Sequence, residues 1–181
     1  MENEETPLDQ EVSEHESLIE PQEIIRLPVF ILLCILTCGL YQIWWSYKAW
    51  KFFKEKDQLD IIPALRAIFA LFFLYALLER IKEYGFQKKA SLYSSALLFI
   101  GFVTTSLLGN LPPPYLLISV LNVLFLVPAF EVLNYSKQVS SDLIVKEIPF
   151  LNDRHLFLVV TGIVFWILII TGIMHPQVKP V

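Results

Sequence analysis

Charged side chains are scarce in this sequence. They make up 18% of its 181 residues, whereas an ordinary soluble domain carries roughly 25%. Hydrophobic residues make up 55%, and the mean hydropathy is +0.57. A chain of this composition has more apolar side chains than a small soluble core can bury, so we expect the excess to face lipid. The composition therefore argues against a soluble domain and predicts a membrane protein.

Cysteine and histidine are also few. Cys34 and Cys38 are the two cysteines, and their spacing of four residues on one helix would hold the thiols too far apart for a disulfide. We expect them to form a buried, inert pair. His15 lies near the N-terminus, while His155 and His175 flank the last apolar run at opposite ends, where we expect interface residues. No metal centre and no cofactor is predicted.

Motifs of known chemistry are missing. The sequence contains no HExxH, no GxxxxGK and no GxSxG pattern. We therefore assign no catalytic residue and no reaction, and a membrane enzyme is the least favoured of the functional hypotheses.

Acidic residues are concentrated at the N-terminus. Nine of the eighteen Asp and Glu residues lie in the first 26 positions, where Arg26 is the only base. Such a segment buries too little apolar surface to offset its ordering entropy, so we predict a disordered acidic tail over 1–26. A transmembrane domain over 27–175 and a short C-terminal tail over 176–181 would follow. Because no basic segment or cleavage site accompanies the first apolar run, we expect that run to stay in the mature protein.

The apolar residues fall into five runs, at 27–47, 61–78, 91–109, 115–133 and 156–174. Four runs reach about 19 residues or more, close to the roughly 20 that a helix needs to cross a bilayer. The second run contains Pro63 and Arg66, and its uninterrupted apolar part would rise only about 18 Å.

Lysine and arginine positions discriminate between four spans and five. Five spans would divide the bases eight against five, which is nearly no asymmetry. If the second run instead dips in and returns, twelve bases share one side and only Arg26 and Lys179 lie on the other. We therefore predict an all-α membrane bundle of four transmembrane helices plus one short re-entrant or interfacial helix, with both termini outside the cytoplasm. Five transmembrane helices are the alternative.

The stretch YQIWWSYKAWKFFKEKDQ at 41–58 interleaves bulky aromatic rings with lysines. Trp and Tyr favour the headgroup layer of a membrane, and lysines beside them attract anionic lipid. We predict that this stretch leaves the bilayer on its cytoplasmic side, with these interface anchors: Trp44, Trp45, Tyr47, Lys48, Trp50 and Lys51. The predicted partners are the bilayer and its anionic headgroups, together with a membrane-protein partner or a second copy of the chain. Single-stranded nucleic acid would use similar residues, but it is not predicted, because anionic lipid already accounts for the lysines.

Proline and small residues predict how the later runs pack. The segment NLPPPY at 110–115 is a stiff turn that favours an antiparallel hairpin of the third and fourth runs. Gly101 and the Thr-Gly pairs at 161–162 and 171–172 offer small surfaces where helices can approach closely.

The residues LTCGLYQIWWSYKAWK, and the segment ALRAIFALFFLYALLERI that follows, resemble the opening of a family of small, uncharacterised bacterial membrane proteins. In that family the first helix ends in Thr, a small residue or Cys, Gly, an aliphatic residue and Tyr, before a cluster of Trp and Tyr with Lys. Gly39, Tyr41 and Trp45 match the pattern, and the resemblance covers about 27–83. It implies a multi-pass protein of the bacterial inner membrane and no catalytic residues.

Four polar residues lie within the apolar runs: Arg66, Tyr75, Asn122 and Glu131. Charged groups at membrane depth are costly and tend to pair with one another, so we predict an ion pair between Arg66 and Glu131. For Asn122 we expect a hydrogen bond between helices.

Two functional hypotheses follow. The first is an accessory or interaction protein that presents a basic, aromatic face to the cytoplasm. The alternative is a small transporter or channel subunit with a polar path near Arg66.

Overall fold

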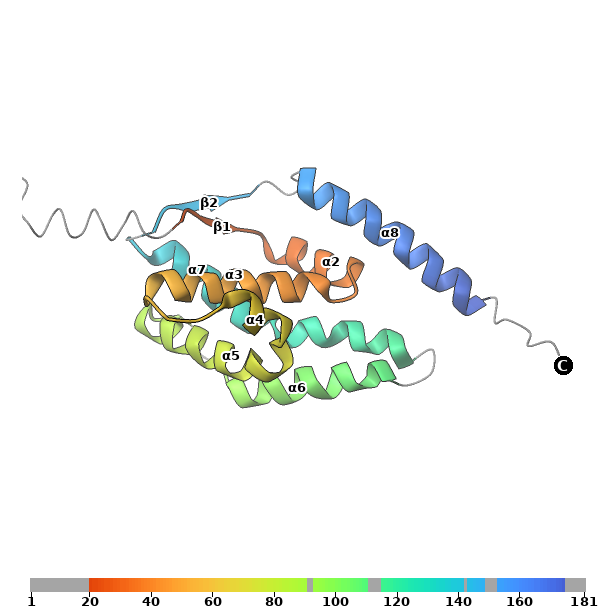
Figure 1. Ribbon diagram of the computed structural model, residues 1–181, viewed down its shortest axis with the longest axis horizontal. Helices are drawn as coiled ribbons and strands as arrows, with labels where there is room; N and C mark the ends of the chain where they lie inside the picture. Colours follow the sequence, from red (N-terminus) through yellow and green to blue (C-terminus); the bar gives the residue numbers. More distant parts are fainter. Residues whose placement is uncertain (1–19, 91–92, 111–114, 142, 149–152, 175–181) are drawn as a thin grey trace, which may run out of the picture.

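The computed structural model describes residues 20–90, 93–110, 115–141, 143–148 and 153–174 (Figure 1). Of the residues that the structure describes, 77% are helical, which confirms the predicted all-α class. Two short strands, β1 (Gln22–Ile24) and β2 (Val145–Glu147), pair in parallel with Gln22 opposite Val145. Residues 22–24 therefore differ from the predicted disordered tail, whereas the rest of that prediction, at 1–19, lies outside the described residues.

The first apolar run forms two helices, α2 (Leu27–Leu36) and α3 (Leu40–Lys56). Gly39 between them has a φ of +91°, a conformation that side-chain-bearing residues rarely adopt. The Thr37 hydroxyl joins the two helix ends, because it donates to the Leu33 carbonyl at 2.7 Å and accepts from the Tyr41 amide at 3.0 Å. This turn reverses the chain (Figure 1).

Ring contacts across the turn overturn the predicted single span at 27–47. In one continuous helix Phe30 and Trp45 would lie about 22 Å apart along the axis. Their ring centroids are 5.7 Å apart instead, so α3 folds back along α2. The physical reason is the left-handed backbone at Cys38 (φ +48°) and Gly39, which no continuing α-helix contains.

The second run leaves one end of the molecule and returns to it. It forms α4 (Pro63–Ile68) and α5 (Ala70–Gln87), separated by a break at Phe69, where φ is −90° and ψ is 37°. α4 packs along α3, and α5 then runs back toward the end where α3 finishes (Figure 1). The chain therefore reverses direction within the second run, while the predicted dip into a bilayer stays a prediction.

The third and fourth runs form the predicted antiparallel hairpin. α6 (Ser95–Leu107) and the short helix η1 (Leu108–Asn110) lead to η2 (Tyr115–Phe125), which packs back against α6 before α7 (Val127–Val139) begins. A Cβ atom on Gly101 would lie 2.2 Å from the ring of Phe125, which confirms the expected close approach. The predicted turn at 111–114 lies outside the described residues.

The last helix, α8 (Asp153–Met174), diverges from the other helices (Figure 1). It meets the α2–α3 turn at Gly162, where an added Cβ would lie 2.7 Å from the Leu36 carbonyl oxygen. Trp166 Nε1 also donates to the Ile35 carbonyl at 3.0 Å. The close approach expected at 161–162 is confirmed. Large apolar side chains are otherwise exposed along this helix: Leu156, Phe157, Val160, Ile163, Val164, Phe165, Ile167, Leu168 and Ile170.

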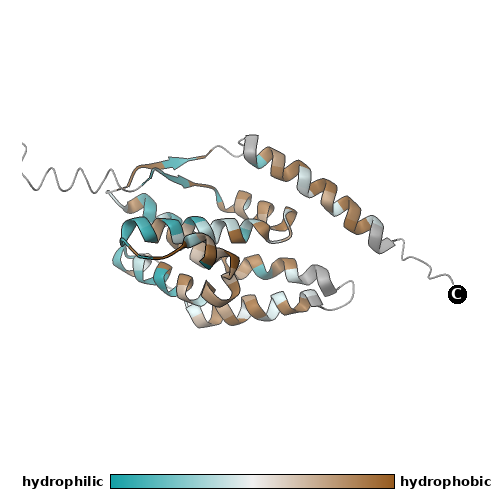
Figure 2. Ribbon diagram, in the orientation of Figure 1, coloured by the Kyte–Doolittle hydropathy of each residue, from teal (hydrophilic) through white to brown (hydrophobic). Residues whose placement is uncertain are grey.

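Polar and apolar residues separate toward different parts of the molecule. Hydrophilic residues gather at the end where α3, α5 and α7 finish and the strands lie, which we call the charged pole, whereas the α6–η2 hairpin and α8 are mainly hydrophobic (Figure 2). Between these regions lies a core in which Phe30, Leu33 and Trp50 are fully buried.

Helix length bears on the predicted number of spans. Within the described part of the chain one helical stretch, Ser119–Val139, is long and apolar enough by length and composition to cross a membrane. Shorter apolar helices occur at Leu27–Leu36, Ser95–Leu107 and His155–Thr171. The described residues therefore do not support four long transmembrane helices, chiefly because the first run turns at 37–39.

Candidate functional site: a cavity behind the basic, aromatic helix

The aromatic and lysine residues of α3 divide between its surface and its buried side. Trp44 is 50% exposed and lies 5.4 Å from the Tyr47 ring, and Lys48 Nζ lies 5.7 Å from the Trp44 ring. Together with Lys51 these residues form what we call the basic–aromatic face. Aromatic rings and ammonium groups thus lie side by side along the surface of α3.

Two of the predicted interface anchors are core residues instead. Trp45 is 7% exposed and packs near Phe30 and Phe130, while Trp50 is 1% exposed. The fold-back of α3 onto α2 buries Trp45, and α4 covers Trp50 through Arg66.

Arg66 is held by aromatic rings. Its guanidinium lies 4.4 Å from the centroid of the Trp50 ring and 5.3 Å from that of Phe73, which is within the range of cation–π attraction. Glu131 is exposed on α7, and among the described residues no ion pair joins it to Arg66. The predicted pair is wrong, because α4 packs against α3 and leaves Arg66 over Trp50.

Asn122 links three helical elements, as predicted for a hydrogen bond between helices. Its side-chain oxygen accepts from Gln42 Nε2 on α3 at 2.7 Å, and its Nδ2 donates to Ser106 Oγ on α6 at 2.9 Å. Asn122 therefore fastens the hairpin to α3.

Tyr75, the fourth predicted polar residue, is 43% exposed on α5 and lies edge-on to Phe99, with ring centroids 5.9 Å apart.

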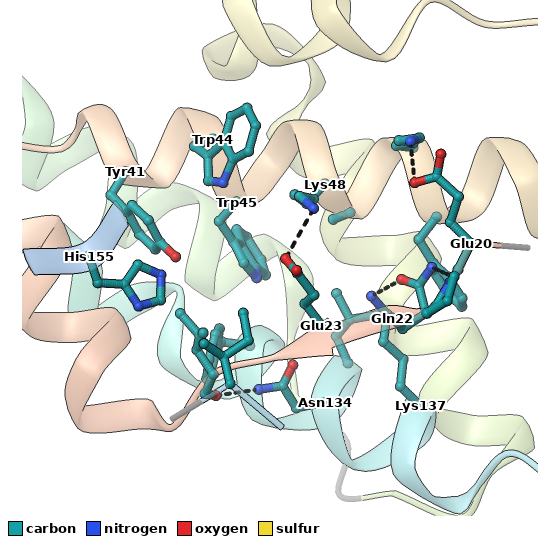
Figure 3. Close-up of a pocket in the computed structure, with 18 of the residues that line it drawn as sticks. Glu20, Gln22, Glu23, Tyr41, Trp44, Trp45, Lys48, Asn134, Lys137 and His155 are labelled. Carbon is teal, nitrogen blue, oxygen red and sulfur yellow. Dashed lines mark hydrogen bonds and ion pairs between the residues drawn. The ribbon is translucent and has the colours of Figure 1, made fainter. Parts of the chain in front are cut away.

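A cavity of about 770 Å³ opens behind α3, between β1, α7 and the start of α8 (Figure 3). Its polar lining residues include Glu20, Gln22, Glu23, Thr37, Lys48, Lys51, Glu55, Asn134, Lys137 and His155, and its apolar ones include Leu40, Tyr41, Trp44, Trp45, Phe52, Phe130, Leu133, Phe157 and Leu158. This volume is typical of small-molecule sites. The sequence did not predict the cavity, because its walls come from two regions far apart in the chain, 20–55 and 130–158.

Acidic residues of the N-terminal segment cover two of the lysines. Lys51 Nζ lies 2.6 Å from a Glu20 carboxylate oxygen and 3.6 Å from Glu55, and Lys48 Nζ lies 3.5 Å from Glu23. The hydrogen bond from Lys51 lowers the pKa of Glu20, and the same bond raises the pKa of Lys51. These pairs attach the segment that precedes α2 to the basic–aromatic face (Figure 3).

Lys137 lies deeper in the wall of the same cavity. Its side chain is 6% exposed, its Nζ donates to Gln22 Oε1 at 2.8 Å, and it lies 4.3 Å from the Phe52 ring centroid. Within the described part of the chain this ammonium forms no ion pair with a carboxylate. Nothing in the sequence alone distinguishes Lys137 from the other lysines.

Further polar atoms in the cavity wall lack partners. His155 is 8% exposed, its ring centroid lies 6.3 Å from that of Tyr41, and its buried Nδ1 has no hydrogen-bond partner in the described structure. One carboxylate oxygen of Glu55 is likewise buried and unpaired there. His155 is thus a buried wall residue rather than the expected interface residue, while His175 lies outside the described residues.

The two cysteines do not form the expected buried pair. Cys34 is buried in α2, whereas Cys38 is exposed in the turn that ends it. No group of three or more potential metal ligands was found among the described residues.

Comparisons with known proteins return nothing for this chain: no family model, no curated protein and no solved structure matches it.

Proposed function

We propose that this chain is an integral protein of the bacterial inner membrane that acts as an accessory or interaction protein, with its basic–aromatic face toward the cytoplasm. The observation that carries the proposal is the exposed apolar surface of α8. This helix exposes nine large apolar side chains and contacts the rest of the protein along one side, at His155, Leu158, Val159, Gly162 and Trp166. An exposed apolar surface of this kind favours burial in lipid or against another protein.

The fold suggests a revised topology. In this proposal the α6–η2 hairpin enters from the charged pole and returns with α7, and α8, whose 22 residues rise about 33 Å, crosses once. The α2–α3 hairpin and the α4–α5 element enter the membrane and return. The N-terminal strand β1 then lies on the cytoplasmic side beside β2, while the C-terminus lies outside.

Charge supports this arrangement. Of the fourteen lysines and arginines, all except Lys179 would lie on the cytoplasmic side, which makes thirteen against one. That asymmetry exceeds the twelve against two of the four-span prediction and agrees with the positive-inside rule. The resemblance of residues 27–83 to small bacterial membrane proteins is a further support. The transporter alternative gains no support from the structure. Arg66 packs against the rings of Trp50 and Phe73 and lines neither of the two described pockets.

Cysteine labelling in cells tests the proposal. In a background with Cys34 and Cys38 replaced by serine, single cysteines at Asp60, Glu20 and Gln177 are exposed to a membrane-impermeant maleimide in spheroplasts. We expect labelling at Gln177 alone, and labelling at all three after permeabilisation. A protein released from membranes by alkaline carbonate would contradict integral insertion, and outside labelling at Glu20 would restore an external N-terminus.

A further inference from the structure

The cavity behind α3 has two ends of different chemistry. Near the charged pole its walls carry Lys51, Lys137 and Gln22, whereas Leu40 and Phe157 line it near the start of α8. Leu40 and Lys51 are separated by eleven residues of one helix, or about 17 Å along its axis. In Figure 3 Tyr41 and His155 lie at one side of the view and Lys137 and Glu20 at the other. A ligand that fits both ends has a polar head and an apolar body.

The deepest lysine of the polar end has no carboxylate in direct contact. Lys51 and Lys48 already contact Glu20 and Glu23, but Lys137 has an amide oxygen and an aromatic ring as its described partners, and Glu55 in the same wall attracts it only at longer range. Burying an ammonium without a counter-charge is costly, so burial lowers the pKa of Lys137 to about 7, with a smaller contribution from the nearby Lys48. A bound anion would favour the charged form of Lys137. An anion in the cavity would supply the missing partner.

The apolar end faces the part of the molecule that the proposed function places in lipid. Phe157 is 71% exposed at the entry of α8, next to the half-buried Leu158, and Trp44 is half exposed on α3. A hydrocarbon chain entering between α3 and α8 would therefore pass from lipid into the cavity without crossing a polar layer.

We propose that the cavity binds one membrane amphiphile with an anionic headgroup, whose charge Lys137 neutralises and whose hydrocarbon chain extends past Leu40 toward Phe157. Glu20 and Glu23, held against the neighbouring lysines, compete with the headgroup for positive charge. The buried, unpartnered Nδ1 of His155 offers a further polar contact along the path. This inference rests on the proposed membrane location, but binding is measured on purified protein, so the two can fail separately.

The test is native mass spectrometry of the full chain in a neutral detergent, titrated with phosphatidylglycerol, with phosphatidylcholine or with inorganic phosphate. We expect one phosphatidylglycerol to bind in preference to phosphatidylcholine, and phosphate alone to bind far more weakly. Lys137→Met, which keeps the apolar stem, should weaken phosphatidylglycerol binding about tenfold or more, because a charge-assisted contact is lost. Lys82→Met, at an exposed lysine of α5 outside the cavity, is the matched control and should bind as the wild type does.

Variants at other positions keep the test decisive if Lys137→Met folds poorly. Leu158→Trp should fill the apolar end and weaken phosphatidylglycerol binding, whereas Leu168→Trp on the exposed side of α8 should not. Replacing both Glu20 and Glu23 by glutamine should strengthen binding several-fold, since two competing carboxylates are removed. Equal binding of the two lipids, phosphate binding as tight as lipid binding, or equal losses in the cavity and control variants would each overturn the proposal.

Discussion

The α2–α3 hairpin and α8 begin from similar sequence and end in different surroundings. Both come from uninterrupted apolar runs about 20 residues long, at 27–47 and 156–174. The first folds back on itself and buries Phe30 completely, whereas α8 continues without a break and exposes most of its apolar residues. Hydropathy predicts that a segment is apolar, but a local turn decides whether its side chains pack within the protein or stay exposed on its surface.

The largest expected effect comes from the buried side of this comparison. Phe30 is 0% exposed, its ring stacks on Phe130 at 4.2 Å, and it also contacts the rings of Tyr41 and Trp45. Phe30→Ala should cost about 3–5 kcal/mol of stability, because it leaves a cavity between the two limbs of the hairpin and α7. Thermal unfolding in detergent measures it, with Phe165→Ala on exposed α8 as the control. Equal losses would show that the two regions are packed alike.

A second variant disrupts the contact between α8 and the α2–α3 hairpin. Gly162→Val would place a Cβ atom 2.7 Å from the Leu36 backbone oxygen, so α8 must shift away from the turn. We expect a cost of about 1–3 kcal/mol from overpacking. Disulfide formation between cysteines introduced at Ile35 and Trp166 should also fall in this variant. Unchanged cross-linking would mean that α8 is not held at this point.

The reversal of the first run depends on the Thr37 hydroxyl. Thr37→Val removes both of its hydrogen bonds at nearly constant volume and leaves the Tyr41 amide without its acceptor. The expected cost is about 1–2 kcal/mol, whereas Thr37→Ser should retain most of the stability. Urea titration in detergent measures the free energy of unfolding of each variant. A valine variant as stable as the serine variant would indicate that Gly39 alone holds the turn.

The smallest effect concerns the attachment of β1 to α3. The pKa of Glu20 is lowered and that of Lys51 is raised by their shared hydrogen bond. The Glu20–Lys51 pair therefore stabilises the attachment of β1 fully between pH 4.5 and pH 10.5, the ordinary pKa values of the two groups. The stabilisation is lost as pH falls through the lowered pKa of Glu20 or rises through the raised pKa of Lys51. Hydrogen exchange at residues 22–24 should quicken, beyond the intrinsic pH effect, as pH falls below 4.5 and through the lowered pKa of Glu20. Glu20→Gln should abolish that extra change, and an unchanged profile would contradict the pair.

Much of the helical arrangement could be predicted from local signals. The return of the second run, the hairpin around the proline-rich turn and the close approaches at Gly101 and Gly162 each follow from a few adjacent residues. The turn at 37–39 was also marked locally, by a glycine that commonly ends helices. Its significance was missed because the surrounding run was long enough to span.

The cavity and the strand pairing could not be predicted, because their parts are distant in the chain. β1 has three residues, too few for a period-two pattern, and its partner β2 lies beyond six α-helices and two short 3₁₀ helices. The bond from Lys137 to Gln22 joins residues 115 positions apart, and neither side chain shows from the sequence alone that the other is near. The Arg66–Glu131 pairing failed for the same reason, since membrane depth alone does not give neighbours.

The parallel pairing of β1 with β2 also constrains how the protein is made. Residue 22 leaves the ribosome early, yet its strand partner at 145 follows only after most of the chain has been synthesised. The bonds from Asn134 to the Ile25 carbonyl and from Lys137 to Gln22 impose the same delay, with separations of 109 and 115 residues. A first hairpin that forms during synthesis would do so while its leading strand is still unpaired. The contacts that close the charged pole cannot form until β2 has been synthesised, just before α8.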